Sequence, residues 1–290
     1  MLFGILPPYR TGVVADPEWM TRFAQLAEEL GFESLYVVEH VAVGAEYDER
    51  YPYAPSGRMP LPIDCPIPDP LELLAFLAAR TERIVLGTGI LVAPIHDPVV
   101  LAKRLATIDV VSGGRMRLGV GVGWMREEIE SVGVDFGTRG ARTDELLQAL
   151  NVIWNDDPAS FSGEFFSFGP IISRPRPVQP GGVPIHVGGH SPAAARRAGR
   201  FGEGYFPLGL DGDTVRDRVA QMRTAARAAG RDPDSLELSL GGLLSATDEA
   251  AVDAAVRLGV DRMILSTTEA DFDVLAEQMQ TFASNWLGVF

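Results

Sequence analysis

The strongest constraint on the fold is a local signal that recurs along the chain. A short apolar segment is followed by a pair of residues that can start a helix, and an amphipathic stretch comes next. The pairs are Asp16-Pro17, Asp69-Pro70, Asp97-Pro98 and Ser191-Pro192. Aspartate and serine cap helices, and proline suits the first helical position. We therefore expect four helices to begin at these pairs, each after a strand.

Eight apolar segments predict β-strands, and helical patterns lie between them. The predicted strands are Leu2–Leu6, Ser34–Val38, Ile84–Val92, Met116–Val122, Ile185–Val187, Gly204–Pro207, Leu236–Leu240 and Met263–Ser266. Later helices are expected near 213–229, 248–258 and 272–284. Strict alternation favours a parallel sheet. Eight units within 290 residues favour a closed (β/α)₈ TIM barrel over an open doubly wound sheet. We expect one α/β domain over residues 1–290.

Two insertions interrupt this alternation. Residues 41–68 contain many prolines and three tyrosines, and residues 155–183 contain four phenylalanines and five prolines. We expect both insertions at the carboxyl ends of the strands, where barrel enzymes build their sites. Long irregular loops there act as lids or binding walls. Capping of the barrel or a contact between subunits is the alternative.

Charge and composition exclude several classes of partner. The net charge of −14 repels nucleic acid and anionic membranes, so we expect neither as a partner. No apolar run is long enough to span a bilayer. The only cysteine, Cys65, rules out an internal disulfide, which agrees with a cytoplasmic location. No H-E-x-x-H motif occurs, and we expect no metal site.

Two glycine motifs point to a ligand. Gly188, Gly189 and His190 end a predicted strand, and Ser191 caps the next helix. Free N–H groups and the helix dipole make such a helix start a phosphate site, although an ordinary cap needs no ligand. The run Gly119–Gly123 is not a dinucleotide fingerprint, because Trp124 stands where a third glycine is required. These glycines allow close approach of a ligand or tight packing at the rim.

Two further features concern the second and third strands. Glu39-His40 closes the second strand, and a carboxylate beside an imidazole suits acid–base catalysis. A histidine that only forms hydrogen bonds in the rim is the alternative. Gly87 and Gly89 interrupt the third strand, which indicates a bulge, a close ligand or a bend in the wall. His96 is expected to be a loop histidine near a helix start.

Taken together, these motifs resemble the luciferase-like monooxygenase superfamily. The resemblance is closest to its actinobacterial branch of coenzyme F420-dependent oxidoreductases. The matching segments are Leu35–His40 (LYVVEH), Leu86–Pro94 (LGTGILVAP), Pro98–Arg117, Leu118–Trp124 (LGVGVGW), Arg139–Trp154 and Pro184–Ala195 (PIHVGGHSPAAA). They cover most of residues 1–207, whereas the last quarter matches only in its general barrel pattern.

The resemblance implies a cofactor at the carboxyl ends of the strands. His40 matches a histidine that sugar-phosphate dehydrogenases of this superfamily use near the cofactor ring. We take His40 as the candidate for the catalytic proton role, with Glu39 tuning or orienting it. The resemblance also implies a cis peptide bond between Gly89 and Ile90, with the Ile90 side chain behind the cofactor ring. The implied cofactor-binding residues are Glu39, His40, Gly89, Ile90, Gly121, Gly123, Gly188, Gly189, His190 and Ser191.

One departure from the family bears on the substrate. Sugar-phosphate dehydrogenases of this superfamily carry glutamate directly after the glycine run, and this chain has Trp124 there. They also bind phosphate through lysines, and Lys103 is the only lysine here. Oxidation of a sugar phosphate is therefore not expected. Glu127 or Glu128 could supply a carboxylate from the next turn.

The sequence thus predicts an F420-dependent oxidoreductase that moves a hydride between the deazaflavin and a small organic substrate. The alternatives are an FMN-dependent monooxygenase and a flavin-binding protein without turnover. Arginines would have to offset the acidic charge near the anionic tail of F420, and Arg58, or Arg174 with Arg176, are the candidates. By resemblance, we also expect a homodimer.

Overall fold

The computed structural model describes residues 1–288 and has the predicted (β/α)₈ barrel. The strands are β1 (Leu2–Leu6), β2 (Ser34–Val37), β3 (Val85–Thr88), β4 (Leu91–Val92), β5 (Met116–Gly121), β8 (Ile185–Gly188), β9 (Gly204–Phe206), β10 (Glu237–Leu243) and β11 (Arg262–Ser266). Their order is β3-β2-β1-β11-β10-β9-β8-β5-β4. Pairing of β3 with β5 closes the ring, and the strands of the ring pair in parallel.

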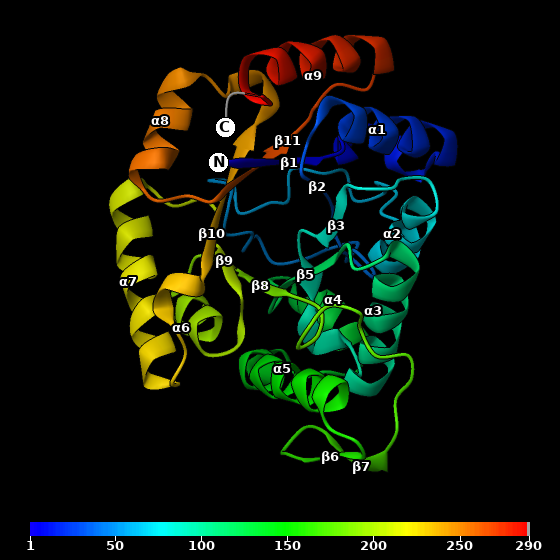
Figure 1. The fold of residues 1–290 in the computed structure, drawn as a ribbon, viewed down its shortest axis with the longest axis vertical. Coiled ribbons are helices and arrows are strands. Elements are labelled where there is room, and N and C mark those ends of the chain that lie inside the picture. Colours follow the sequence, from blue (N-terminus) through cyan, green and yellow to red (C-terminus); the bar gives the residue numbers. More distant parts are fainter. Residues whose placement is uncertain (289–290) are drawn as a thin grey trace.

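Helices surround this ring (Figure 1). They are α1 (Pro17–Leu30), α2 (Pro70–Ala78), α3 (Pro98–Ser112), α4 (Arg126–Ser131), α5 (Arg139–Asn155), α6 (Pro192–Phe201), α7 (Gly212–Ala228), α8 (Glu249–Arg257) and α9 (Phe272–Trp286). Short α4 was not predicted from the sequence. Among residues 1–288, none of the helices combines the length and apolar character that a membrane crossing requires.

The four expected helix starts are confirmed. The side chain of Asp16 accepts hydrogen bonds from the backbone N–H groups of Glu18 and Trp19. Asp69, Asp97 and Ser191 cap α2, α3 and α6 in the same way, with proline at the first helical position each time. These bonds satisfy N–H groups that have no partner within the helix. Hydrogen bonds between residues close in sequence therefore fix the residue at which each of these helices begins.

The predicted third strand is divided into β3 and β4. The peptide bond between Gly89 and Ile90 is cis, as expected from the family resemblance. β3 pairs with β2 and with the first half of β5, and β4 pairs with the second half of β5. Between β3 and β4, beside the centre of β5, the regular pairing of the backbone with β5 is therefore interrupted.

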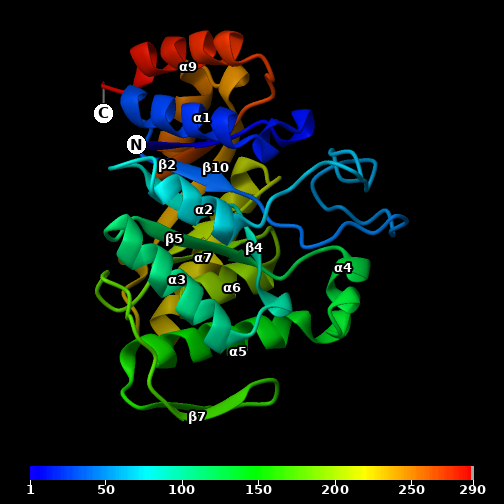
Figure 2. The same ribbon diagram turned by 90° about the vertical axis from the view of Figure 1, so that its right-hand side faces the viewer.

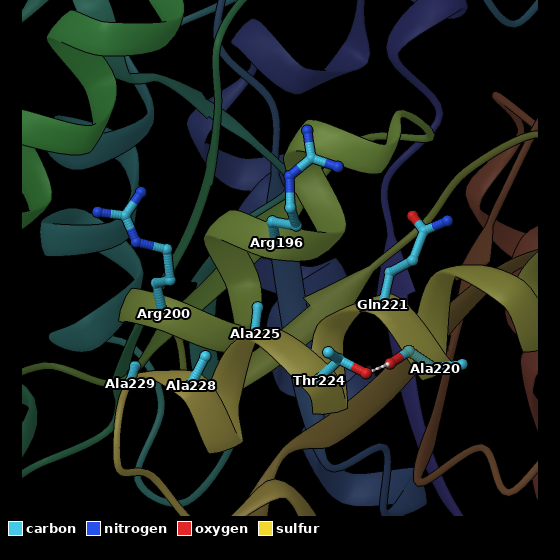
Figure 3. A pocket seen from close by; sticks show the side chains of 8 residues that line it. All are labelled: Arg196, Arg200, Ala220, Gln221, Thr224, Ala225, Ala228 and Ala229. Atoms are coloured by element: carbon cyan, nitrogen blue, oxygen red, sulfur yellow. Dashed lines mark hydrogen bonds between the residues drawn. The ribbon is translucent and has the colours of Figure 1, made fainter.

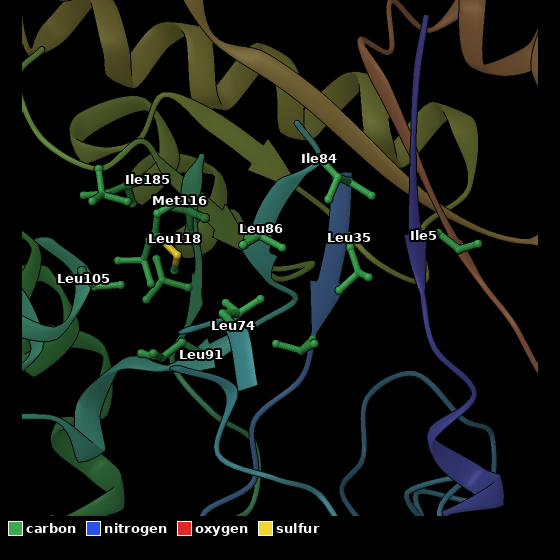
Figure 4. Close-up of a cluster of buried hydrophobic side chains, with 14 of the residues drawn as sticks. Ile5, Leu35, Leu74, Ile84, Leu86, Leu91, Leu105, Met116, Leu118 and Ile185 are labelled. Atoms are coloured by element: carbon green, nitrogen blue, oxygen red, sulfur yellow. The ribbon is translucent and has the colours of Figure 1, made fainter. Parts of the chain in front are cut away.

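Buried aliphatic side chains fill the layer between the ring and the helices. Leu35, Leu86 and Leu118 on neighbouring strands meet Leu74 of α2 and Leu105 of α3 (Figure 4). These five side chains are fully buried. Because side chains alternate across a strand, the intervening residues face the inside of the barrel. The outer layer holds the fold together, and the interior and its two ends are free to carry polar groups.

The two insertions lie in different places. Residues 41–68 and α4 project from the same side of the barrel, at the carboxyl ends of the strands (Figure 2). The second insertion forms a hairpin of β6 (Ala159–Ser162) and β7 (Ser167–Ile171), whose turn is held by the Glu145 carboxylate of α5. Gln179 then bonds Asp109 and the carbonyl of Met116, at the start of β5.

The expected place of residues 155–183 was therefore wrong. This insertion follows a helix and precedes a strand, so it runs along α5 and ends at the amino ends of the strands. Only residues 41–68 follow a strand and border the carboxyl ends. The order of elements in the chain, and not the aromatic content of the loop, decides which end of the barrel it reaches.

Candidate active site at the carboxyl ends of the strands

His40 lies just beyond β2 and is held by Glu128 of α4. Its Nδ1 is 2.9 Å from Oε2 of Glu128, and the other carboxylate oxygen accepts a hydrogen bond of 2.7 Å from the N–H of Val41. Glu128 is 2% exposed and the His40 side chain 12%. The Trp124 ring system also lies edge-to-face with the imidazole, with centroids 6.1 Å apart. The imidazole is therefore fixed from two sides.

Glu39 has different partners from those expected. Its buried carboxylate accepts a hydrogen bond of 2.6 Å from the N–H of Val92 and lies 3.0 Å from Nε2 of His96. The orienting contact between Glu39 and His40 was thus predicted wrongly. Successive residues at the end of a strand point to opposite sides, so Glu39 turns toward β4 and His40 turns toward α4. A direct part for Glu39 in catalysis or cofactor binding remains a prediction.

The glycines at the ends of β5 and β8 make room for Ile90. A Cβ atom on Gly121 would lie 2.0 Å from Cδ1 of Ile90, and one on Gly188 would lie 2.8 Å from its Cγ2. Ile90 also packs against the buried cluster of Tyr36, Phe206 and Ile264. With Ile90 placed as it is, a side chain at either glycine would collide with it. Gly123 has a φ of 74°, which glycine adopts without strain, where the chain turns away from the barrel.

The segment from Gly188 to Ser191 forms the predicted helix start. Ser191 Oγ accepts a hydrogen bond from the N–H of Ala194, and Tyr205 donates its hydroxyl hydrogen to the carbonyl of Gly189. Nδ1 of His190 is buried and has no hydrogen-bond partner among the described residues. Arg218 of α7 donates to the carbonyl of His190. A buried nitrogen without a partner beside a helix N-terminus fits a site for an anionic ligand group.

Aromatic rings from the first insertion connect the two ends of this site. Trp124 packs on Tyr51 with centroids 5.1 Å apart, Tyr51 on Tyr53 at 5.4 Å, and Tyr53 on His190 at 5.5 Å. Together with the contact between Trp124 and His40, they form a continuous row of rings from β2 to β8. We call these five residues the mouth row. Residues 41–68 thus place two tyrosines at this end of the barrel, and their part as a binding wall remains a prediction.

The tyrosines of the mouth row are uncharged at neutral pH. Burial raises the pKa of Tyr51. Burial, with a smaller contribution from neighbouring Tyr51, raises the pKa of Tyr53 to about 12. Their hydroxyl groups therefore remain protonated, and this part of the wall is apolar with polar edges.

The arginines considered for an anionic tail are divided between the two ends. Arg174 and Arg176 pair with Asp157 in the second insertion, close to the end of α5. Asp157 follows the carboxyl end of α5, on the amino side of the barrel, whereas the mouth row lies on the carboxyl side. The expectation that Arg174 and Arg176 bind the anionic tail of F420 is therefore not supported. Arg58 belongs to the first insertion, where it pairs with Glu49 at 2.9 Å and lies over the ring of Tyr47.

A hollow elsewhere on the molecule has less suitable chemistry. This hollow of about 590 Å³ lies between α6 and α7, flanked by Arg196 and Arg200 and lined by four alanines with Gln221 and Thr224 (Figure 3). Thr224 in its wall already donates to the carbonyl of Ala220. Lining of this kind offers neither a paired acid and base nor an aromatic surface. The carboxyl ends of the strands, which hold both, are therefore the candidate active site.

Sequence reasoning identified part of this site and missed part. His40, Ile90, the glycines and the segment 188–191 were predicted, and the structure gathers them at one end of the barrel. Glu128 was noted only as a possible source of a carboxylate, and the partnership of His96 with Glu39 was missed. The adjacent Glu127-Glu128 pair, one turn beyond the glycine run, was the available signal.

Comparison with known proteins identifies relatives of this chain. An F420-dependent glucose-6-phosphate dehydrogenase of Microbacterium testaceum is 30% identical over 241 residues, 79% of this chain and 66% of the relative. An FMNH(2)-dependent dimethylsulfone monooxygenase of Pseudomonas putida is 30% identical over 218 residues, 74% of this chain and 55% of the relative.

Among solved structures, monooxygenase RslO1 from Streptomyces bottropensis superposes with a TM-score of 0.80 at 25% identity, covering 99% of both chains. The family model described as luciferase-like monooxygenase matches residues 1–285. The protein described here therefore belongs to the luciferase-like monooxygenase family.

Proposed function

We propose that the protein is an F420-dependent oxidoreductase that transfers a hydride between the deazaflavin and a small organic substrate. The observation that carries the proposal is the fixed imidazole of His40 at the carboxyl ends of the strands. Hydride transfer to or from a carbon–oxygen bond requires a proton donor or acceptor, and an oriented histidine supplies one near neutral pH. The relative from Microbacterium testaceum uses F420 according to its name.

The residues of the site fit such a cofactor. Gly188, Gly189, His190 and Ser191 would hold its phosphate at the start of α6, where the buried Nδ1 of His190 lacks a protein partner. Ile90, whose place is kept open by Gly121 and Gly188, would support the ring system. When bound, the cofactor supplies the hydride chemistry; the protein orients the substrate, excludes water and moves a proton at His40.

FMN is the second candidate, and one observation favours it. Arg174 and Arg176 lie at the other end of the fold, so of the arginines considered only Arg58 is on the side of the mouth row, and it is paired with Glu49. A single phosphate needs fewer cations than a polyanionic tail. The relative from Pseudomonas putida uses FMNH(2) according to its name. The corresponding function is an FMN-dependent monooxygenase.

Binding of the two cofactors distinguishes these proposals. Purified protein without cofactor is titrated with F420 and with FMN, and fluorescence reports binding. Tighter binding of F420 supports the first proposal, and tighter binding of FMN supports the monooxygenase. If one binds but reduced cofactor supports no turnover with candidate acceptors, a flavin-binding protein without catalysis is the better description. If neither binds, both enzyme proposals fail.

A further inference from the structure

We propose that Glu128 is the positioning residue of His40. Its carboxylate holds the imidazole in the tautomer that carries the proton on Nδ1, so that Nε2 is the nitrogen that exchanges a proton with the substrate. The inference rests on the proposed function, because that function gives His40 its proton role. Glu128 itself makes no contact with the reacting atoms.

The hydrogen bonds of Glu128 determine the tautomer. An ionised carboxylate only accepts hydrogen bonds. Oε1 of Glu128 accepts from the N–H of Val41 at 2.7 Å, and Oε2 lies 2.9 Å from Nδ1 of His40. With an ionised Glu128, Nδ1 carries the proton of this bond. In the neutral ring Nε2 then holds the lone pair, and in the charged ring it holds the proton that can be released.

The surroundings of Glu128 make this arrangement rigid. Glu128 is 2% exposed, and the next residue of α4, Ile129, is fully buried. Ser131 donates its hydroxyl hydrogen to the carbonyl of Glu128. On the other side, the bond to Val41 ties the same carboxylate to the first residue of the insertion that carries the tyrosines of the mouth row. One side chain thus fixes both the imidazole and the root of the substrate wall.

Glu127 offers a matched control. It is the neighbouring residue of the same helix and carries the same charge. Its carboxylate accepts a longer bond of 3.3 Å from the N–H of Asp48, and no hydrogen bond joins it to His40 in the described part of the chain. It is also more exposed than Glu128. Loss of a negative charge from α4 can therefore be separated from loss of the contact with His40.

The tautomer can be measured directly by NMR. Full-length protein labelled with ¹⁵N-histidine gives two-bond ¹H–¹⁵N correlations whose pattern distinguishes the tautomers, and His40→Gln identifies the signals of His40 among the four histidines. The wild type should show the proton on Nδ1. In Glu128→Gln the amide oxygen can accept from Val41 only if the amide NH₂ faces Nδ1 and donates to it. The proton of His40 should then move to Nε2.

The controls make the outcome decisive. Glu127→Gln should leave the His40 signals unchanged, and Glu128→Asp, which keeps an acceptor for Nδ1, should retain the wild-type tautomer. A wild-type ring protonated on Nε2 alone, or a Glu128→Gln protein with the wild-type pattern, overturns the proposal. The wild-type spectrum decides the first point even if Glu128→Gln does not fold.

Activity then separates this inference from the proposed function. In Glu128→Gln, turnover at saturating F420 should fall by about 10²–10⁴-fold, as for loss of a general acid or base, while F420 affinity is kept. Glu128→Asp should retain part of the turnover that Glu128→Gln loses. Failure of the wild type to bind F420 or FMN overturns the proposed function alone, because the tautomer is read without cofactor. Unchanged turnover in Glu128→Gln overturns the role of Glu128 alone.

Discussion

At the scale of single residues, two side chains that are adjacent in sequence have different hydrogen-bond partners. Glu39 and His40 are neighbours in sequence, yet Glu39 bonds the backbone of β4 and His96, whereas His40 bonds Glu128. Glu39 thus secures the strand that follows Ile90, and His40 is left to face the site. A carboxylate and an imidazole next to each other in a sequence need not form a pair.

Replacement of His40 tests the proton role. If His40 gives or takes a proton in the rate-limiting step, His40→Ala should lower turnover by about 10²–10⁴-fold, the usual range for general acid–base catalysis. The affinity for cofactor should fall much less. Turnover is measured at saturating cofactor, and affinity by fluorescence titration. Near-normal turnover refutes the proton role, and loss of the cofactor assigns His40 to binding instead.

At the scale of elements, the end of strand β5 packs against the side chain of Ile90, which lies between β3 and β4. Gly121 occupies the end of β5, where any Cβ would lie 2.0 Å from Cδ1 of Ile90. The glycine run of β5 was predicted as a place where a ligand or a tight packing contact approaches the backbone. The packing contact is what the structure shows, and the approach of a cofactor to Ile90 remains a proposal.

A double-mutant cycle tests this contact. Gly121→Ala should lower the free energy of unfolding by about 1–3 kcal/mol, the usual cost of overpacking. Ile90→Val removes Cδ1, so the cost of Gly121→Ala should be much smaller in that background. Urea denaturation of the four proteins measures the coupling. Equal costs of Gly121→Ala in both backgrounds contradict the assigned contact.

At the scale of the whole molecule, a charged cluster joins strands from both halves of the chain at the amino ends. Arg262 is 1% exposed and bonds Glu33 at 2.8 and 2.9 Å and Glu237 at 2.8 Å. Arg117 pairs with Glu33 at 3.2 Å, and the buried ring of His186 lies 3.6 Å from Glu237. The two ends of the barrel thus differ: arginine–carboxylate pairs join the strands at the amino end, and histidine–carboxylate pairs with aromatic rings lie at the carboxyl end.

His186 gives this cluster a dependence on pH. Burial lowers the pKa of His186 well below 6.5, and the charges of Arg117 and Arg262 lower it further. The folded protein therefore keeps His186 neutral at a pH where the unfolded chain already binds a proton. Stability should fall as pH decreases below about 6.5, toward the folded pKa, by at most about 1.4 kcal/mol per pH unit.

The substitution His186→Gln should remove this slope. Urea denaturation at pH 7.5, 6.5 and 5.5 measures it for both proteins. Burial raises the pKa of Glu33, but its bond to Arg262 and the charges of Arg117 and Arg262 outweigh burial, so its pKa is below 4.5. The stability linked to Glu33 is present above pH 4.5 and lost below it, outside this window. Parallel curves for the two proteins contradict the role of His186.

We also propose that the whole molecule is a homodimer with two-fold symmetry. Most apolar residues of α2 and α3 pack on their own barrel, but Val100 and Val111 of α3 are 58% and 61% exposed. Eleven residues are close to three helical turns, so both lie on one face of α3. Light scattering at micromolar concentration should give twice the monomer mass, and Val100→Glu with Val111→Glu should halve it. A wild-type monomer refutes the proposal.

Local signals in the sequence were sufficient for the barrel. Caps such as Asp16 and Ser191 and the alternation of strands with helices act within a few residues, so they can be read without knowing the rest of the fold. They predicted the eight units, the helix starts and the end of the barrel where His40 and the segment 188–191 lie. The division of the third strand at Gly89 came from family resemblance.

Contacts between distant segments were decided only by the tertiary structure. Glu128 is 88 positions from His40 and His96 is 57 from Glu39, and nothing in the local pattern ranks these partners above the adjacent pair Glu39-His40. The place of residues 155–183, by contrast, follows from the order of the elements, because they come after α5 and before β8. The sequence by itself determined the elements and the types of residue at their ends; the direction of each side chain, and therefore each pairing of acid with base, depends on closure of the ring.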